Sequence, residues 1–283
     1  HHAARGAAEP LTVRARRVVV AAGASHTPAL LRRSGLSHPH LGRHLRLHPT
    51  AAVAARYDER MEPWFGIMLP TMVDEWAYLH GAYGVRLETP PAHPGLMALA
   101  LPWRSGEEHK ELMTDAAHLA TFIVLTRDRD GGAVTLDARG QPRLHYRLST
   151  FDRGHLLRGL REAAHIHRAA GARSVLLPHQ RHLRIDLGTE AALDEALKGI
   201  ESWGWGPNQV TLFSAHQMGT CRMGGDAERH PLTPDQESRE VQNLFVADGS
   251  VFPAASGVNP MLTIQALAHF TAQGIKGRAW GGG

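Results

Sequence analysis

The residue best suited to chemistry in this sequence is a histidine in the glycine-containing segment SAHQMGTCRMG, residues 214–224. An imidazole has a pKa suited to accepting a proton near neutral pH, so a histidine in such a segment can serve as a general base. We therefore expect His216 to be a catalytic base, a role that typically accelerates a reaction ~10²–10⁴-fold. Gly219 and Gly224 would let the backbone approach a flat cofactor closely. The alternative is a purely structural histidine, in a chain that has 20 of them.

A second candidate is Asn259, which directly precedes Pro260. Proline biases the residue before it toward extended backbone. The Asn259 amide can then donate a hydrogen bond to a developing alkoxide, as the donors of an oxyanion site do. An isolated Asn-Pro pair is otherwise typical of a turn, so the residues alone leave both interpretations open.

A third candidate is the pair Asp248–Gly249, which ends the apolar run NLFVAD at residues 243–248. Such a run is typical of a buried strand, and in open α/β sheets ligands bind beyond the carboxyl ends of the strands. A carboxylate at that position can accept hydrogen bonds from ligand hydroxyls, and glycine permits close approach. The alternative for this pair is an Asp-Gly turn.

The other histidines and the single cysteine carry weaker signals. His44 and His48 are four residues apart, but the sequence has no HExxH motif and no evident third ligand, so we expect no metal site. Cys221 has no second cysteine with which to form a disulfide in this chain, and no Ser or Cys triad is apparent. We expect Cys221 to be buried rather than nucleophilic.

The first of the elements that position these residues lies near the start of the sequence. Residues 18–22 (VVVAA) are typical of a strand that is buried on both faces of a parallel sheet and that ends at Gly23. Thr27 then predicts the N-cap of a helix, Pro28 its first residue and Gly35 its end. A strand, a glycine turn and a helix in this order predict one step of an α/β sheet.

The sequence changes character between residues 49 and 206. Three predicted strands with turn residues between them suggest an antiparallel meander: 122–126, 133–137 and 143–148. Two further segments predict helices, at 152–170 and at 190–202, the second capped by Thr189. Residues 49–102 show no clear period and are expected to be mostly loop. Their aromatic and methionine residues are either core or the wall of an apolar channel: Trp64, Phe65, Met68, Met72, Trp76 and Tyr78.

The last quarter returns to the first pattern, with the strand at 243–248 and an apolar-faced helix at 261–274. We therefore predict an α/β plus α+β fold. Residues 1–48 and 208–283 would form one discontinuous α/β domain, and residues 49–207 a second domain with a mixed or antiparallel sheet.

Composition excludes several other classes of protein. The chain has 283 residues, 43% hydrophobic and 20% charged, which is typical of a globular protein. No window approaches the ~18 apolar residues of a membrane span, and no leader is visible, so we expect a soluble, cytoplasmic protein without a transmembrane segment. The 31 Lys and Arg residues are scattered among 27 Asp and Glu residues, which argues against nucleic-acid binding.

Four groups of segments together resemble the glucose–methanol–choline (GMC) oxidoreductases, the FAD-dependent alcohol oxidases and dehydrogenases. They are residues 18–24 (VVVAAGA) with 30–36 (LLRRSGL), 41–49 (LGRHLRLHP), 214–224 (SAHQMGTCRMG), and 243–253 (NLFVADGSVFP) with 259–266 (NPMLTIQA). Residues 83–94 (YGVRLETPPAHP) make the chain most similar to the long-chain fatty alcohol oxidase branch. The resemblance covers nearly the whole chain and corresponds to the C-terminal portion of the family.

This resemblance implies FAD as the cofactor and a Rossmann-like FAD-binding domain beside a substrate domain. It matches His216 to the catalytic histidine of the family and Asn259 to its partner position, which holds His or Asn. It places Ala22 and Gly23 near the adenosine end of FAD and the start of the 261–274 helix near the pyrimidine ring of the flavin. The implied cofactor-binding residues are Ala22, Gly23, Asp248, Gly249, Asn259, Pro260 and Met261.

One feature of the family is absent from the sequence. The GxGxxG turn that binds the FAD pyrophosphate does not occur, and we expect it in an N-terminal FAD-binding portion that is missing before His1. The chain alone would then bind FAD poorly.

The reaction that the resemblance implies is oxidation of a primary, long-chain alcohol to the aldehyde, with hydride transfer to the flavin and molecular oxygen as acceptor. Its partners would be a lipophilic alcohol and oxygen. Two alternatives stay open: a GMC dehydrogenase for sterol, sugar or choline-type alcohols that uses another electron acceptor, and a non-catalytic, truncated binding module that lacks the FAD half.

Overall fold

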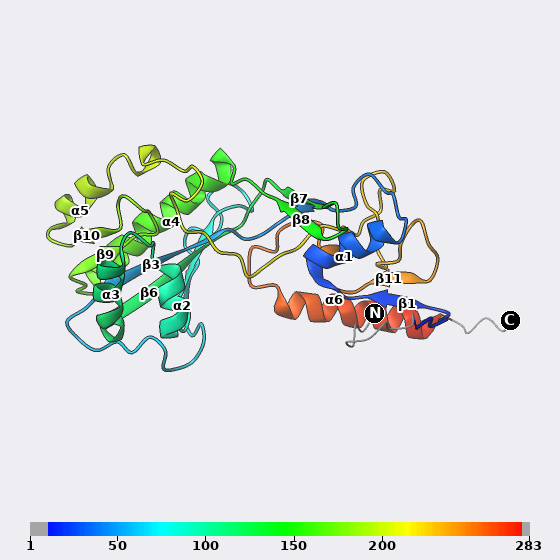
Figure 1. Cartoon of the computed structure of the whole chain (residues 1–283), viewed down its shortest axis with the longest axis horizontal. Coiled ribbons are helices and arrows are strands. Elements are labelled where there is room, and N and C mark those ends of the chain that lie inside the picture. Colours follow the sequence, from blue (N-terminus) through cyan, green and yellow to red (C-terminus); the bar gives the residue numbers. More distant parts are fainter. Residues whose placement is uncertain (1–10, 279–283) are drawn as a thin grey trace.

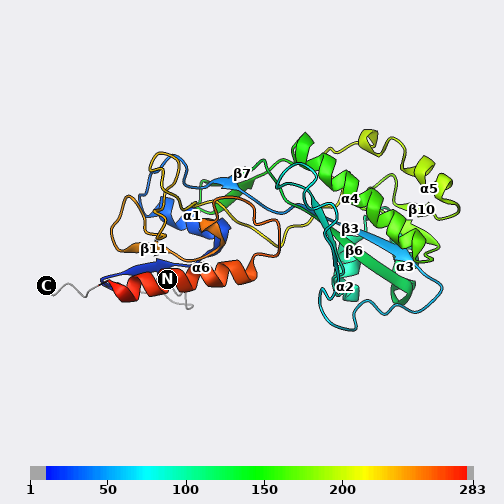
Figure 2. The ribbon, with the colours of Figure 1, turned by 180° about the vertical axis from the view of Figure 1, so that it is seen from behind.

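The computed structural model of the protein describes residues 11–278, which form two lobes (Figure 1). One lobe contains a six-stranded sheet, and the other contains a pair of parallel strands with two helices. A three-stranded sheet packs against one helix of this second lobe, and Figure 2 shows the two lobes from behind. Within residues 11–278, no helix has both the length and the apolar content needed to cross a membrane.

The smaller lobe is built from the two ends of the described chain. Strand β1 (Val18–Val20) pairs in parallel with β11 (Leu244–Val246), with Val18 opposite Leu244. Helix α1 (Gly23–Arg33) follows β1, a short 3₁₀ turn η3 (Gly249–Val251) follows β11, and α6 (Met261–Gly277) completes the lobe. This parallel pair with its helices agrees with the predicted α/β unit.

The larger lobe is organised around an antiparallel sheet in the order β10-β9-β3-β6-β5-β4. Its strands are β3 (Thr50–Arg56), β4 (Met72–Val73), β5 (Val85–Glu88), β6 (Leu119–Thr126), β9 (Ser174–Leu176) and β10 (Arg184–Asp186). The central strand β3 lies in the stretch that the sequence predicted to be mostly loop. Its alanine-rich sequence TAAVAAR has no strong strand propensity, and pairing with β6 and β9 on its two sides supplies the missing stabilisation.

Helix α4 (Thr150–Ala169) covers one face of this sheet and begins at Ser149, whose side chain accepts a hydrogen bond from the N–H of Asp152. Alternate strand residues such as Val53, Val85 and Val124 pack against its apolar side, as the period of two in a strand requires. The helix lies unusually close to the sheet at Gly159, where an added Cβ would be 2.3 Å from Cγ1 of Val124. Glycine at this position therefore sets the helix–sheet distance.

The opposite face of the sheet is covered only in part. Helix α2 (Pro94–Ala100) and helix α3 (Gly106–Thr114) pack over the β3–β6–β9 region, around Met97, Leu101 and Leu119. Residues of the same face that lie nearer the other lobe are left to line a cavity. The remaining short elements are η1 (Ala116–His118), α5 (Glu190–Leu197) and η2 (Ile200–Ser202).

The three-stranded sheet changes the predicted strand pairing. Strand β2 (Arg43–Leu45) pairs with β7 (Gly132–Leu136), which pairs with β8 (Pro142–His145). Strand β6 instead pairs with β3 and β5, so the predicted three-strand meander is wrong and only the β7–β8 hairpin forms. The physical reason is that the pairing partners of β6 are distant in the sequence, where local turn signals carry no information.

Two predicted helix ends also differ from the structure. Helix α1 begins at Gly23 rather than after Thr27, because Asp248, in the segment that follows β11, accepts a hydrogen bond from the N–H of Gly23. The predicted helix 190–202 divides in two, since Gly199 takes a φ of 74° after Leu197. Strand β1 is less buried than predicted: Val18 and Val19 are 47% and 49% exposed.

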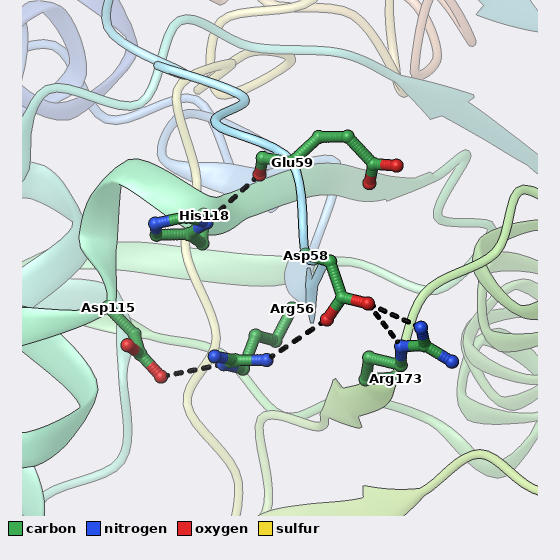
Figure 3. Close-up of polar contacts among 6 residues, drawn as sticks. All are labelled: Arg56, Asp58, Glu59, Asp115, His118 and Arg173. Atoms are coloured by element: carbon green, nitrogen blue, oxygen red, sulfur yellow. Dashed lines mark hydrogen bonds and ion pairs between the residues drawn. The ribbon is translucent and has the colours of Figure 1, made fainter.

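Charged side chains join three segments at the end of β3 that lies far from the other lobe (Figure 3). Arg56, the last residue of β3, donates through Nε to Asp115 at 2.8 Å, and Arg173 donates through Nε to Asp58 at 2.8 Å. The Arg173–Asp58 pair is largely exposed and the Arg56–Asp115 pair is partly exposed, and ion pairs open to solvent contribute little to stability individually. Their effect is to hold the end of β3 against the segments that precede β6 and β9.

Candidate functional site

An apolar cavity of about 430 Å³ lies between the partly open sheet face and α2. Its walls include Ala52, Ala54, Leu101, Ile123 and Leu176, and its polar residues include His216 and Asn259. The structure thus brings together the two residues that the sequence predicted to be catalytic, although they come from different loops. A long apolar space with a polar group at the wall is the usual form of a site for a lipophilic small molecule.

His216 is in contact with a second histidine. Its Nδ1 lies 3.1 Å from Nδ1 of His48, and the two rings meet edge to face with centroids 5.2 Å apart. His48 is fully buried, and burial together with the neighbouring His216, Arg127 and Arg86 lowers its pKa from 6.5 to about 3. Burial also lowers the pKa of His216. Both imidazoles are therefore neutral near pH 7.

The loop before Asn259 is held by residues of the larger lobe. The N–H of Gly257 donates to Nε2 of His48 at 3.0 Å, and the Gly257 carbonyl accepts a hydrogen bond from the guanidinium of Arg86. Arg127 donates through Nε to the carbonyl of Ala255 at 2.9 Å. These bonds fix the segment that carries Asn259 relative to His48 and hence to His216.

Asn259 has a partner of its own on the sheet. Its Nδ2 donates to Oε2 of Glu88 at 3.3 Å, and Glu88 lies in the cavity wall with only 3% of its surface exposed. Burial raises the pKa of Glu88, while the bond from Asn259 and the charge of Arg86 act in the opposite direction. Glu88 is the one carboxylate among the described residues that line the cavity.

Two pairs of predicted cofactor-binding residues meet in the smaller lobe: Ala22 and Gly23, expected at the adenosine end, and Asp248 and Gly249, expected at the hydroxyl groups of the ribityl chain. Oδ2 of Asp248 accepts hydrogen bonds from the N–H of Gly23 at 3.0 Å and from Oγ1 of Thr27 at 2.5 Å, and its Oδ1 accepts from the N–H of Ser250. Asp248 thereby joins the ends of β1 and β11. A Cβ at Gly249 would lie 3.0 Å from the carbonyl oxygen of Gln217, so this glycine is required by close packing. Direct contact of Ala22, Gly23, Asp248 and Gly249 with FAD stays a prediction.

The start of α6 has the features of a site for a polar acceptor. The first helical hydrogen bond runs from the N–H of Ile264 to the carbonyl of Pro260, and no side chain caps the amides before it. Met261 and Leu262, which follow Asn259 and Pro260, are 64% and 72% exposed. Free amides at an exposed helix N-terminus suit an electron-rich ring oxygen such as that of a flavin pyrimidine.

In the 214–224 segment, the structure gives Gly219 a reason for being glycine that was not predicted, and it places Cys221 in the interior as predicted. Gly219 has a φ of 83°, and its Cα lies against the backbone of His44, whose oxygen would be 2.7 Å from an added Cβ. The need for glycine therefore arises inside the protein and does not require a cofactor. Cys221 is fully buried, and burial raises the pKa of its thiol, which agrees with a structural role.

The sequence did not single out His48 or Glu88 as parts of the site. His48 precedes Pro49, and from the sequence we weighed its side chain only as a metal ligand. Among residues 11–278, no three His, Cys, Asp or Glu side chains form a group that could hold a metal ion. Glu88 sits in the segment VRLE, where Val85 and Leu87 face the core. Because side chains alternate along a strand, Glu88 lies on the opposite face, which lines the cavity. A charged residue at a strand position that should be buried was the one sequence feature that pointed to Glu88. Of the uncertain aromatic and methionine residues, Met68 lines the cavity, whereas Phe65 is 85% exposed.

A parallel βα unit that returns at the end of the described chain, joined to a six-stranded antiparallel sheet with an apolar cavity, defines a two-lobed α/β plus α+β protein. The chain belongs to the GMC oxidoreductase family, whose sequence models match residues 2–50 and 128–268. It is 36% identical over 267 residues to the long-chain-alcohol oxidase FAO4B of Arabidopsis thaliana, an alignment that covers 91% of this chain and 35% of that protein. The chain thus spans about a third of the length of this relative.

Solved structures have the same fold at lower identity. Pyridoxine 4-oxidase from "Mesorbium loti" superposes with a TM-score of 0.64 at 18% identity, over 93% of this chain and 52% of that one. The formate oxidase of Aspergillus oryzae RIB40, in a structure that concerns modification of its FAD, superposes with a TM-score of 0.61 at 17% identity, over 92% of this chain and 54% of that one. These likenesses confirm the predicted fold class.

Proposed function

We propose that this chain forms the substrate lobe and part of the cofactor lobe of an FAD-dependent oxidase of primary, long-chain alcohols. The alcohol is oxidised to the aldehyde: the hydroxyl oxygen loses a proton to the site and the carbon loses a hydride to the flavin. With FAD bound, molecular oxygen would be the final electron acceptor and hydrogen peroxide the second product. The substrate oxygen lies against His216 and Asn259, with the alkyl chain along the apolar wall.

The observation that carries this proposal is the cavity with its predominantly apolar wall and a few polar side chains. His216, Asn259 and Glu88 come from three segments of the chain and line the same space as Ala54, Leu101 and other apolar residues. An alkyl chain would gain free energy on leaving water for such a wall, at about 25 cal/mol for each Å² buried. The similarity to long-chain-alcohol oxidases supports the same class of substrate.

The residues of the smaller lobe suit FAD, the cofactor of GMC oxidoreductases. The uncapped amides of Met261 and Leu262 stand next to Asn259, and the Gly23–Asp248 contact closes the ends of the two parallel strands. When bound, FAD supplies a two-electron acceptor for the hydride of the alcohol. The chain's own residues bind and orient the alcohol and accept the proton of its hydroxyl group.

The experiment that tests this proposal uses the FAD-loaded protein that contains this chain, with a series of primary alcohols. His216→Ala should reduce turnover by ~10²–10⁴-fold and leave the yellow flavin spectrum unchanged. Exposed His26→Gln, at the surface of α1, is the matched control and should keep full turnover. Unchanged turnover in His216→Ala would overturn the assignment of this cavity.

The electron acceptor is tested separately. An oxidase consumes oxygen and releases hydrogen peroxide in equal amounts to the aldehyde formed. A GMC dehydrogenase would instead give aldehyde only when an artificial electron acceptor is present, with little peroxide under air.

A further inference from the structure

The N–H of Gly257 donates a hydrogen bond to Nε2 of His48, at 3.0 Å. A backbone N–H can only donate, so Nε2 of His48 holds a lone pair and no proton. His48 is fully buried and neutral near pH 7, so its one ring proton is on Nδ1. The backbone at Gly257 therefore selects the tautomer of His48.

The tautomer of His48 determines that of His216. Nδ1 of His48 lies 3.1 Å from Nδ1 of His216, and since the first of these nitrogens carries the proton, the second must accept. A neutral His216 then carries its own proton on Nε2. In this state His216 presents an N–H donor to the cavity. Protonation of its Nδ1 as well would place two N–H groups against each other, which is unfavourable.

The cavity offers a different group as proton acceptor. Glu88 lies in the same wall and accepts a hydrogen bond from Nδ2 of Asn259 at 3.3 Å. One oxygen of its carboxylate is used in that bond, and no hydrogen bond to Oε1 is recorded within residues 11–278. Buried surroundings that raise a carboxyl pKa also make the carboxylate a better base.

We infer that His216 donates a hydrogen bond to the substrate oxygen, held in that state by His48, and that the carboxylate of Glu88 accepts the hydroxyl proton. This inference rests on the proposed function and replaces the expectation that His216 is the base. His48 is a positioning residue, because it acts through His216. His216 and Asn259 stabilise the developing alkoxide, as paired oxyanion donors do.

The step balances in atoms and charge. The O–H bond of the alcohol breaks and its proton converts the Glu88 carboxylate to a carboxylic acid. The C–H bond breaks and its hydrogen leaves as hydride, with both electrons, to the FAD that the proposed function supplies. The carbon and oxygen are left joined by a double bond as the aldehyde.

The first test compares variants of the FAD-loaded protein in turnover of a long-chain alcohol. Glutamine can donate a hydrogen bond but is not a base near neutral pH, so His216→Gln should retain at least tenfold more turnover than His216→Ala. Glu88→Gln should lose ~10²–10⁴-fold, whereas the exposed Glu228→Gln, a matched control, should lose nothing. Equal losses in the two His216 variants, or a Glu88→Gln variant within a few-fold of the parent, would overturn the inference.

The second test follows the proton itself. When the alcohol reduces the flavin without oxygen, infrared difference spectra should show the carbonyl stretch of a newly protonated carboxyl group, which shifts in D₂O and is missing in Glu88→Gln. The activity of the parent should fall at low pH as Glu88 becomes protonated, and Glu88→Gln should lack this dependence on Glu88. The charged group that acts on Glu88 is Arg86 on its own strand, and the titratable group that lines the same cavity is His216.

A third measurement separates failure of this inference from failure of the proposed function. Neutron diffraction from a deuterated crystal near pH 7 should show deuterium on Nδ1 of His48 and on Nε2 of His216, whatever the substrate. Deuterium on Nδ1 of His216 would overturn the tautomer assignment even in an active alcohol oxidase. A parent protein that oxidises no long-chain alcohol would instead contradict the proposed function.

Discussion

The imidazole of His48 accepts a hydrogen bond from the backbone N–H of Gly257, and these two residues come from opposite ends of the chain. His48 precedes the central strand β3, and Gly257 belongs to the loop that leads into α6. One hydrogen bond thus joins the sheet of the larger lobe to the loop that carries Asn259. The same ring contacts His216 at 3.1 Å, so it links all three loops of the site.

We predict that glutamine replaces His48 better than phenylalanine does. His48→Phe leaves the buried N–H of Gly257 without a partner, which should lower the free energy of unfolding by about 1–3 kcal/mol. It should also reduce turnover at least tenfold, because His216 loses the donor that sets its tautomer. His48→Gln can both accept from Gly257 and donate to His216, so it should recover part of each loss. Urea denaturation and turnover measure the two effects, and equal behaviour of the two variants would contradict the assigned role.

We predict that the buried His167 makes the protein sensitive to acid. Its Nε2 donates to the carbonyl of Val53, its Nδ1 accepts from Tyr57, and burial lowers its pKa from 6.5 to about 4. The folded state then resists a proton that the unfolded chain binds, so stability is full above pH 6.5 and falls as the pH is lowered toward 4. The loss from this one group is up to about 3 kcal/mol, at 1.36 kcal/mol for each pKa unit.

The measurement is the urea midpoint between pH 7 and pH 4 in the parent and in His167→Gln. The variant should be less stable than the parent at pH 7 and should lose less stability on acidification. The exposed His26→Gln serves as the control and should follow the parent at every pH. A parallel course for the His167 variant and the parent would contradict the prediction.

We predict that the far part of the cavity sets the length of the substrate. Ala54 lies in the cavity wall four residues beyond Thr50 on β3, about 13 Å along the strand. Ala54→Phe should fill this region and reduce kcat/KM for long-chain alcohols at least tenfold, while short-chain alcohols are oxidised as before. A series of primary alcohols of increasing length measures the effect. An equal loss at every chain length would show that the alkyl chain does not lie along β3.

We predict that α4 does not tolerate a larger residue at Gly159. A Cβ there would lie 2.3 Å from Val124 and 2.8 Å from Val85, so Gly159→Leu must move the helix away from the sheet. The expected cost is about 1–3 kcal/mol of the free energy of unfolding. Gly154→Leu is the matched control on the same helix, since an added Cβ at Gly154 contacts nothing within 4 Å. Equal midpoints of the two variants in urea would contradict the packing role of Gly159.

Part of this structure was predictable from local sequence. The apolar runs at β1 and β11, the Thr189 cap of α5 and the Gly35 stop of α1 depend on neighbouring residues, and the structure contains a strand or a helix end at each. The antiparallel pairing of β3 with β6 was not predictable, because the alanine-rich β3 gains its stability from strands that are distant in the sequence. The start of α1 was misplaced for the same reason, since its capping carboxylate belongs to Asp248.

The site was predicted in part. His216 and Asn259 stood out from their motifs, and the structure places both at one cavity. His48 and Glu88 did not, because the meaning of each depends on a partner in another segment, Gly257 for one and Asn259 for the other. A period of two along β5 indicates only that Glu88 faces away from α4. Its contact with Asn259 depends on the tertiary structure, which the local sequence does not reveal.

The most direct test of the central claim is anaerobic mixing of the FAD-loaded protein with a long-chain primary alcohol in a stopped-flow spectrometer. We predict loss of the yellow flavin absorbance, with one aldehyde formed for each flavin. In His216→Ala the rate of this loss should be reduced at least a hundredfold, roughly the effect of removing one oxyanion donor. A flavin that stays oxidised with the parent protein, or that is reduced equally fast in His216→Ala, would contradict this prediction.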